Sequence, residues 1–313
     1  MNIWSYIIRK LINMIPTLLG VCLIVFVLFN LVAPDPALLL LGKHGTVEQI
    51  AQIHRELGLD RPFWVQYLDI VKSAFTMDFG YSWSSKQEIW TMIKNGALPS
   101  LAITAPAFII ANSIAISISL LVAFYRGKVI DKAVAIICVA MMSIPSLAYI
   151  LFGQYFFSYK LGMFEIAGYE PGFPNFIPYV LLPIVLSVII EIGPEVRYYR
   201  TAIMDEIFQD YVRTARSKGL SERVILFKHV LKNAMIPILT SLIMQIPFLV
   251  LGGILIESFF SIPGLGGMTI KAINTSDFPV IKAMTILSAI AFMMFNLITD
   301  IMYTVVDPRL KLK

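Results

Sequence analysis

The sequence predicts an all-α integral membrane protein with six transmembrane helices. Hydrophobic residues make up 58% of the 313 residues, charged residues only 14%, and the mean hydropathy is +0.79. A helix needs about 20 apolar residues to cross a hydrocarbon layer of about 30 Å. Six stretches of the chain meet this requirement, namely 11–33, 98–124, 133–157, 176–196, 235–257 and 281–305.

The distribution of basic residues predicts that both termini are cytoplasmic. With the N-terminus inside, most of the 25 Lys and Arg residues fall in the inner segments, and the densest run lies between the fourth and fifth spans. This asymmetry follows the positive-inside rule. The pI of about 9.1 therefore needs no nucleic acid to explain it.

The first span should be retained in the mature protein. Its apolar run exceeds the h-region of a signal peptide, and Ala33-Pro34-Asp35-Pro36 is not a small-x-small cleavage site. Cys22 and Cys138 fall inside predicted spans, where apolar packing is favoured over a disulfide or a metal pair. His44, His54 and His229 show no metal-ligand spacing.

Residues 34–96 form the one sizeable outer segment, and turn signals predict a small helical cap there. Thr46 with Gln49, and Ser85 with Glu88, have the spacing of capping boxes. The cap could be packing on the outer membrane face or a platform for an extracytoplasmic protein. The expected helices run from Thr46 to Leu57 with Gly58 closing, from Asp60-Arg61-Pro62 onward, and from Ser85 to Asn95-Gly96.

Polar residues inside the spans have two interpretations each. Asn112, Ser113, Ser117 and Ser119 could join helices, which we favour, or line a passage. Ser143-Ile144-Pro145-Ser146 interrupts the third span, against either protein or a water-filled cavity.

Glu191 and Glu195 lie at positions i and i+4 near the end of the fourth span, where acids are costly unless paired. Pairing with Arg197, Arg200 or a partner subunit is the simpler expectation. Alternatively, Glu191 faces a translocation cavity and attracts a cationic or amine-bearing solute.

The polar segment after the fourth span predicts two amphipathic helices that meet at a glycine. Apolar residues from Ile203 to Ala215, including Phe208, recur at spacings of three and four, as on one helix face. Gly219 has the place of a C-terminal cap, and Ser221 could cap the next helix. On its own this segment could be a solvated cytoplasmic loop.

Four motifs resemble one family over essentially the whole chain. The run Asp-Tyr-Val-Arg-Thr-Ala-Arg-x-Lys-Gly-Leu-Ser at 210–221 closely resembles the EAA loop of binding-protein-dependent ABC importer permeases, in the form of the dipeptide/oligopeptide/nickel branch, with Arg213 where the general motif has Glu. Three further segments resemble the same branch. They are residues 56–68, the outer Glu-x-x-Phe-Ser-Ile-Pro-Gly-Leu-Gly run at 257–266, and the C-terminal Asp300 with Asp307-Pro308-Arg309.

This resemblance implies a type I ABC importer permease fold with a helical extracytoplasmic cap beside a binding protein. It implies a coupling loop, 198–236, that docks into a separate ATPase subunit, and an outer loop near the outer gate. The implied coupling residues are Asp210, Tyr211, Arg213, Thr214, Ala215, Lys218, Gly219, Leu220, Val224, Phe227, His229, Leu231 and Asn233. The implied outer gate residues are Glu257, Phe260, Ser261, Pro263, Gly264 and Gly266, and possible cavity residues are Asn112, Ser143 and Glu191.

The expected function is that of a permease subunit, not an enzyme, in an ATP-driven importer of di- or oligopeptides, in a bacterial inner membrane. No Gly-x-x-x-x-Gly-Lys-Ser/Thr motif occurs, so ATP and Mg are expected on partner ATPases and no cofactor in this chain. The expected partners are a second homologous permease, two ATPases, an extracytoplasmic solute-binding protein and membrane lipid. The expected segments are 1–33, an N-terminal interfacial helix with the first span; 34–96, the cap; and 97–313, the permease core.

Other functions are less favoured by the sequence. Nickel or another small solute remains an alternative cargo within the same family. An ion-coupled secondary transporter would need titratable groups at mid-depth and often an internal repeat, and only Glu191 and Asp300 come close. A membrane enzyme would need a motif such as His-Glu-x-x-His or Gly-x-Ser-x-Gly, and neither occurs.

Overall fold

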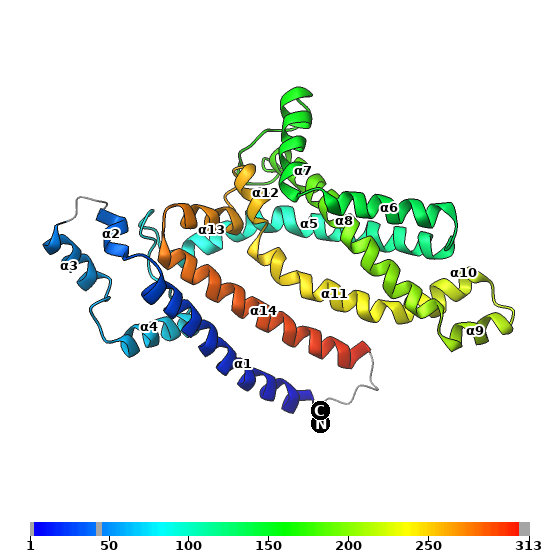
Figure 1. Ribbon diagram of the computed structural model, residues 1–313, viewed down its shortest axis with the longest axis horizontal. Helices are drawn as coiled ribbons and strands as arrows, with labels where there is room; N and C mark the ends of the chain where they lie inside the picture. Colours follow the sequence, from blue (N-terminus) through cyan, green and yellow to red (C-terminus); the bar gives the residue numbers. More distant parts are fainter. Residues whose placement is uncertain (1–2, 42–45, 307–313) are drawn as a thin grey trace. The chain divides into compact units, whose positions relative to one another are not determined.

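The computed structural model describes residues 3–41 and 46–306, which form a succession of helices (Figure 1). His44 and the C-terminal Asp307-Pro308-Arg309 motif lie outside the described residues. The elements are α1 Ile3–Val27, the π-helix η1 Leu28–Val32, α2 Pro36–Leu41, α3 Val47–Glu56, α4 Phe63–Thr76, α5 Ile89–Phe124, α6 Val129–Ser143, α7 Ser146–Gly153, the π-helix η3 Gln154–Lys160, α8 Ile177–Ile207, α9 Asp210–Ser217, α10 Glu222–Val224, the π-helix η4 Ile225–Val230, α11 Leu231–Leu251, α12 Ile254–Phe259, α13 Leu265–Asn274 and α14 Phe278–Val306.

The helical membrane fold class is confirmed. Within the described residues, five helical segments are long and apolar enough to cross a membrane, and a bent pair of helices supplies a sixth crossing if it counts as one span. The five segments are Ser5–Val32, Ile89–Phe124, Ile177–Ile207, Glu222–Phe259 and Phe278–Met302.

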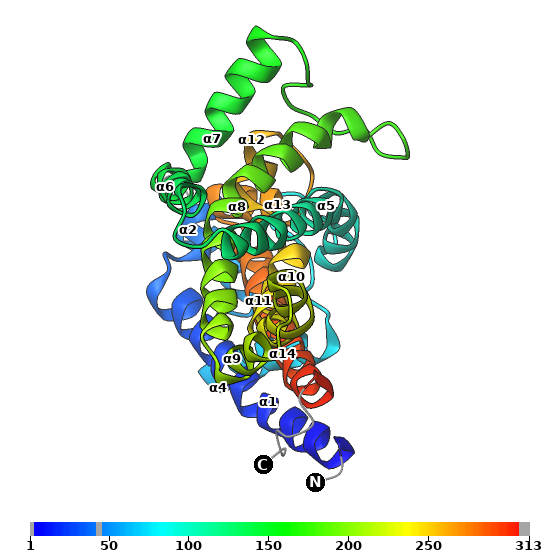
Figure 2. The ribbon, with the colours of Figure 1, turned by 90° about the vertical axis from the view of Figure 1, so that its right-hand side faces the viewer.

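The third predicted span, 133–157, is two helices and not one. Val129–Ser143 and Ser146–Lys160 meet at an angle of 85°, and Figure 2 shows α7 leading away from α6. Pro145 disfavours a helical conformation at the residue before it. Ile144 accordingly is extended, with φ −92° and ψ 124°, and α7 restarts after Pro145. The predicted interruption is therefore present as a sharp bend.

The second predicted capping box, Ser85 with Glu88, is wrong. Glu88 forms an isolated antiparallel bridge with Tyr81, and the Ser85 hydroxyl donates to Ser82 Oγ at 2.9 Å. Helix α5 starts at Ile89 and continues through Asn95 and Gly96 for 36 residues. An Asn-Gly pair is only a weak stop signal, and here the apolar span that follows it carries the helix onward.

The chain divides into two compact units, and the described residues of the first lie within 3–96 and 268–297. Its core packs Leu18 and Cys22 of α1 against Ala74 of α4 and Ile286 of α14. The predicted cap helices α3 and α4 are confirmed. Thr46 forms the full capping box with Gln49, and Gly58 follows α3 with φ +68°.

Within this unit a buried carboxylate joins the cap to α14. Asp277, 2% exposed, precedes α14 and accepts hydrogen bonds from Ser82 Oγ at 2.5 Å, Trp83 N at 3.0 Å and Ser84 N at 3.1 Å. Trp83 also packs on the Phe278 ring, with the centroids 5.7 Å apart. The chain just before α5 is thus fixed to the turn that starts α14.

The described residues of the second unit are 97–267 and 298–306. Its largest core cluster joins α5, α6, α8, α9, η4 and α11, with Tyr199 and Ile203 of α8 fully buried. Helix α8 continues 11 residues beyond the predicted end of the fourth span at 196, to Ile207. The predicted division into a first span (1–33), an extracytoplasmic cap (34–96) and a permease core (97–313) depends on where the membrane lies, and it stays a prediction.

Candidate functional site

The polar segment after α8 is a short helix, a glycine turn and a second helix, packed on the second unit. Helix α8 ends at Ile207, and α9 runs from Asp210 to Ser217. The predicted single apolar face is therefore broken at Phe208 and Gln209. Phe208 is wrongly placed by the prediction, because its side chain is 62% exposed and lies under the Arg126 guanidinium.

One face of this segment is anchored in the core. Val212 and Ala215 of α9, with Ile225, Leu226 and Val230 of η4, are buried in the cluster that holds Ile203 and Ile207. The π-helical turn at Ile225–Val230 changes the register of the helix relative to α11.

Tyr211 is half-buried and is held by hydrogen bonds within the chain. Its hydroxyl donates to Glu206 Oε2 at 2.6 Å and interacts with the Asn233 side chain. Burial, with the neighbouring Glu206 carboxylate, raises the pKa of Tyr211 to about 12, so the hydroxyl stays protonated at neutral pH.

The glycine turn is stabilised by an ion pair across it. Gly219 has φ +76°, as its predicted capping role requires. The predicted cap at Ser221 is wrong, because Ser221 precedes α10 without a side-chain hydrogen bond. Arg216 instead binds Glu222 through Nε–Oε1 at 2.7 Å and Nη2–Oε2 at 3.3 Å.

The predicted coupling residues divide by exposure. Three apolar side chains point away from the anchored face, with exposed fractions of 39% for Leu220, 41% for Val224 and 59% for Phe227. The other exposed members are Asp210, Arg213, Thr214, Lys218 and Gly219; Tyr211, His229, Leu231 and Asn233 are half-buried; and Ala215 is buried.

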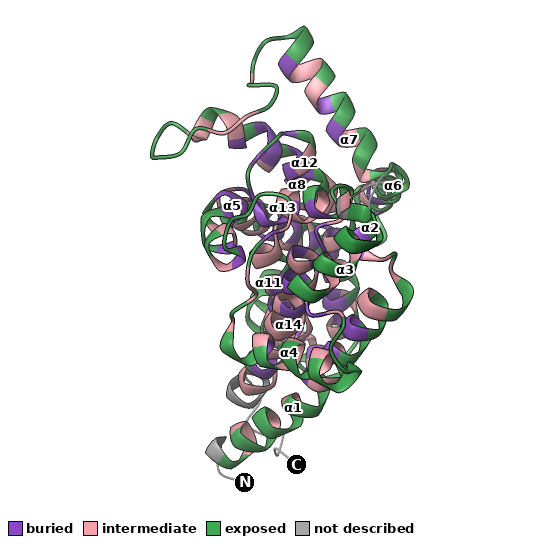
Figure 3. Ribbon diagram, turned by 90° about the vertical axis from the view of Figure 1, so that its left-hand side faces the viewer, coloured by how far each residue is buried: buried purple, intermediate pink, exposed green. Residues whose placement is uncertain are grey.

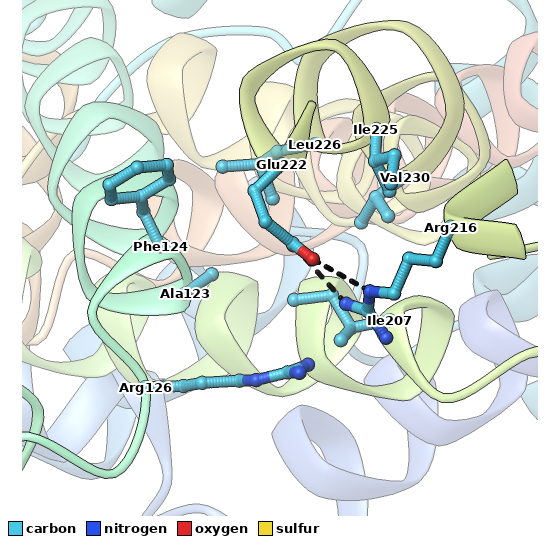
Figure 4. Close-up of a pocket in the computed structure, with 9 residues that line it drawn as sticks. All are labelled: Ala123, Phe124, Arg126, Ile207, Arg216, Glu222, Ile225, Leu226 and Val230. Carbon is cyan, nitrogen blue, oxygen red and sulfur yellow. Dashed lines mark hydrogen bonds and ion pairs between the residues drawn. The ribbon is translucent and has the colours of Figure 1, made fainter. Parts of the chain in front are cut away.

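A pocket lies behind the segment, on the side of the core. Figure 4 shows its apolar walls, with Arg126 on one side and the Arg216–Glu222 pair on the other. Sequence reasoning placed neither Arg126 nor Glu222 in a site. The lining residues are Ala123, Phe124, Arg126, Ile207, Arg216, Glu222, Ile225, Leu226 and Val230.

The outer loop is built around a buried carboxylate. Glu257 of α12 is 0% exposed and accepts hydrogen bonds from Gly253 N and Gly267 N, each at 3.0 Å. Ser100 of α5 also hydrogen-bonds this carboxylate, and its Oγ accepts from Leu265 N at 2.8 Å. Two backbone N–H groups and the Ser100 side chain thus converge on the Glu257 carboxylate.

The loop glycines serve close packing more than turning. A Cβ on Gly264 would collide with the Glu257 carboxylate, and one on Gly266 would lie 2.7 Å from Ile254 N. Neither glycine has positive φ, whereas Gly252, at +78°, does. Gly252 and Gly253 also end α11 at Leu251, so the fifth predicted span, 235–257, is interrupted before its end.

The stretch 158–175, to which sequence reasoning gave no role, covers this outer loop. Gln154 Nε2 donates to Phe259 O at 2.9 Å and to Ile166 O at 3.1 Å, while Gly168 N donates to Phe260 O at 2.8 Å. Phe260 and Ile262 are buried in the cluster with Val180 and Leu186 of α8.

The three possible cavity residues have different surroundings. Asn112 is buried, donates to Phe108 O at 2.8 Å and accepts from the Tyr199 hydroxyl, so it joins α5 to α8, as the favoured interpretation expects. Ser119 similarly donates to Val196 O at 3.0 Å. Ser143 is exposed and donates within its own helix to Val139 O.

The expected pairing of Glu191 and Glu195 with Arg197 or Arg200 is wrong in the described structure. Arg200 binds Asp131 of α6 at 2.7 Å. Glu195 Oε1 instead accepts from Gln245 Nε2 of α11 at 3.0 Å, while its Oε2 is buried without a hydrogen-bond partner. Glu191 lies midway along α8 and is half-buried.

The segment 210–230 and the loop around Glu257 stay the predicted coupling and gate regions. Among the described residues no group of three or more His, Cys, Asp and Glu is placed to hold a metal ion, and Cys22 and Cys138 are buried and unpaired. The burial of both thiols confirms the packing interpretation.

Comparison with known proteins identifies relatives along the full chain. Residues 115–312 match the family model "Binding-protein-dependent transport system inner membrane component", and residues 3–104 match "Binding-prot-dependent transport system membrane comp, N-term". The chain is 32% identical over 309 residues to the glutathione transport system permease protein GsiC of Salmonella choleraesuis (strain SC-B67), with 99% of each chain covered. The proteins of the same name from Shigella flexneri and Escherichia coli (strain K12) are 31% and 30% identical, again with 99% of each chain covered.

Proposed function

This chain belongs to the family of binding-protein-dependent transport system inner membrane components, and on that premise we propose how its parts serve an ATP-driven importer. It is a multi-pass permease subunit. In the proposal, α9, α10 and η4 form the coupling surface that docks into a separate ATPase subunit, and the Glu257 loop stands near the outer gate.

One observation carries the coupling proposal. The segment 210–230 is anchored by one face in the core, while Leu220, Val224 and Phe227 are exposed on the other. Completely burying such a side chain contributes about 1.5–3 kcal/mol. Because the three side chains are roughly half exposed, docking could still provide roughly half of that free energy for each. A rigid segment with an exposed apolar face transmits a push from its partner to α8 and α11.

The proposed complex supplies what this chain lacks. ATP and Mg are bound by two ATPase subunits, a second homologous permease completes the pathway, and an extracytoplasmic binding protein delivers the solute. Both termini and residues 198–236 face the cytoplasm in this proposal.

Peptides are the proposed solutes, with short ones favoured, because the relatives at 30–32% identity are named for glutathione transport. Nickel or another small solute is the alternative cargo. Glu191 is proposed to meet the amino group of the solute, since it is half-buried at the middle of α8 and Arg200 is bound to Asp131.

Co-purification tests the coupling proposal. The tagged chain is purified from its native membrane as wild type, Gly219→Asp and Gly162→Asp. Both glycines have positive φ, +76° and +62°, and open space where a Cβ would be, so the two variants carry the same backbone strain. We expect the ATPases to be lost only from Gly219→Asp, with the second permease retained in all three. A Gly219→Asp variant with full ATPase content and full uptake would contradict the proposal.

Two uptake assays test the cargo and the energy source. Glu191→Gln should lower uptake of a peptide with a free amino terminus more than that of its N-acetylated form, and equal effects would remove the Glu191 proposal. Uptake should stop when ATP is depleted and continue with an uncoupler, whereas an ion-coupled transporter would show the reverse.

A further inference from the structure

The pocket behind the coupling segment is lined by two arginines, Arg126 and Arg216, but by only one carboxylate, that of Glu222. Arg126, in the turn between α5 and α6, is half-buried, and within the described residues no hydrogen bond or ion pair holds its guanidinium. The guanidinium carbon lies 5.7 Å from the centre of the Phe208 ring, and the guanidinium also attracts the Glu222 carboxylate across the pocket. A guanidinium presents planar donors suited to phosphate and carboxylate oxygens.

The pocket has a net positive charge despite its carboxylate. Glu222 is bound at both oxygens by Arg216, so that pair is neutral as a unit. The remaining charge of the lining is that of Arg126. The other lining side chains are apolar, including Phe124, Ile207 and Leu226 (Figure 4). A positive rim over apolar walls suits an anionic amphiphile.

The surroundings of the pocket are those of a membrane surface. Val129 and Ile130 follow the turn with exposed fractions of 81% and 43%, and Phe124 is 40% exposed. Lys128 lies over the Tyr125 ring in the same turn, 5.2 Å from its centroid. Exposed apolar residues beside aromatic and basic ones are typical of the headgroup region on the inner side.

The pocket lies away from the proposed docking face. Ile225, Leu226 and Val230 line the pocket from the buried side of η4, whereas Val224 and Phe227 are exposed. An acidic side chain of the ATPase would approach that exposed side, so a lipid is the better match to the pocket.

We propose that this pocket binds the phosphate of an anionic phospholipid from the inner leaflet, with Arg126 as its main ligand. Basic pockets on the cytoplasmic side of membrane helices favour such headgroups. The bound lipid joins the α5–α6 turn to the coupling segment and holds that segment in place. The inference rests on the proposed inner location of residues 198–236, but not on which solute is carried.

Native mass spectrometry of the intact complex tests this inference. The complex is purified as wild type, Arg126→Gln and Arg61→Gln, then exposed to detergent containing phosphatidylglycerol or phosphatidylcholine. Loss of one basic contact should weaken retention of phosphatidylglycerol about fivefold in Arg126→Gln. Arg61→Gln is the matched control, because Arg61 is exposed in the cap and does not line the pocket, and it should retain the lipid as the wild type does. Phosphatidylcholine should be retained equally by all three.

Three outcomes would overturn the inference. Equal phosphatidylglycerol retention in wild type and Arg126→Gln would show that the pocket does not select the lipid. Displacement of the lipid by millimolar inorganic phosphate would assign the pocket to free phosphate. Loss of the ATPases from Arg126→Gln, with lipid retention unchanged, would assign it to the partner interface. The coupling proposal is tested separately, because Gly219→Asp should lose the ATPases and keep the lipid.

Discussion

At the scale of single residues, Glu257 organises the outer loop from within. Its carboxylate accepts N–H groups from Gly253 and Gly267, which lie on either side of it in the sequence. Because the carboxylate is fully buried, each bond removed leaves a buried polar group unsatisfied. The adjacent glycines are required mainly because the carboxylate and the α12 backbone occupy the space of their side chains.

We predict that Gly264→Ala destabilises the protein and Gly253→Ala does not. A Cβ at 264 would overlap the Glu257 carboxylate, whereas one at 253 would meet Ile256 Cβ at an ordinary 3.6 Å. Overpacking of this kind costs about 1–3 kcal/mol. The complex is heated and its monodisperse fraction is measured by size exclusion. The temperature at which half of that fraction is lost should fall by several degrees in Gly264→Ala only. Equal curves for the two variants would mean that the loop is looser than described.

The Arg200–Asp131 pair is the second residue-scale feature with a measurable consequence. The Asp131 side chain is 9% exposed and also accepts from Gly127 N at 2.9 Å, so it ties the α5–α6 turn to α8. Removing one partner of a buried pair leaves an uncompensated charge, which costs about 3–5 kcal/mol. The Arg200 side chain is 31% exposed, which reduces that figure.

Arg200→Met should therefore lower the free energy of unfolding by about 2–4 kcal/mol. Arg213→Met is the control, because Arg213 and Asp210 are 73% and 95% exposed and such surface pairs contribute about 0–1 kcal/mol. Thermal unfolding followed by tryptophan fluorescence compares the two. A smaller effect for Arg200→Met than for Arg213→Met would show that another group compensates Asp131.

At the scale of elements, the cap is joined to the membrane helices by few contacts of high specificity. Residues 82–84 are held by Asp277, and Tyr67 of α4 donates to Leu19 O of α1 at 3.1 Å. The Lys282 ammonium of α14 donates to Asn30 Oδ1 at 3.3 Å, and Asn30 in turn donates to Gln66 of α4. Figure 3 shows that most of the outer surface of α3 is exposed.

Asp277→Ala should release the segment before α5. The substitution would leave the Trp83 and Ser84 N–H groups without their acceptor, and each unsatisfied group costs about 1–3 kcal/mol of stability. Trypsin should then cleave after the exposed Lys86 about tenfold faster than in the wild type. Asp69→Ala removes an exposed partner of Arg61 and should leave this rate unchanged. Unaltered cleavage in Asp277→Ala would show that other contacts hold the segment.

The elements with strong local signals were predictable from sequence. The spans have long apolar runs, α3 has a capping box, and Pro145 interrupts the third span, so each was expected in its place. The failures occurred where a weak local signal competed with a longer pattern. Asn95-Gly96 was overridden by the span that follows it, and the Ser221 side chain makes no capping hydrogen bond at the start of α10.

The candidate site was only partly accessible from sequence. The family resemblance implied Leu220, Val224 and Phe227 as coupling residues; the structure shows that they are exposed, and no comparison tests their role. Residue spacing cannot predict contacts between residues that lie far apart in the chain. Two such contacts are the Arg200–Asp131 ion pair and the hydrogen bond between Ser100 and Glu257. Which of several arginines meets a given acid is decided by helix packing.

At the scale of the whole molecule, the proposed function depends on which side of the membrane each polar segment faces. The basic residues concentrate in the segments that include 210–232, and this distribution predicts an inner location for the coupling surface. ATP is available on that side only, so an inverted chain could not couple to an ATPase. Orientation is therefore the prediction on which the coupling proposal rests.

Two single substitutions measure the orientation directly. Ser84→Cys lies in the cap and Ser217→Cys in the coupling segment, and both serines are exposed. Cys22 and Cys138 are buried, so the wild type should give no labelling background with a membrane-impermeant maleimide. In cells with a permeabilised outer membrane and intact inner membrane, Ser84→Cys should be labelled and Ser217→Cys should not, until the inner membrane is opened. Labelling of Ser217→Cys before that step would place the coupling segment outside, where neither an ATPase nor inner-leaflet lipid could reach it, and would remove both proposals together.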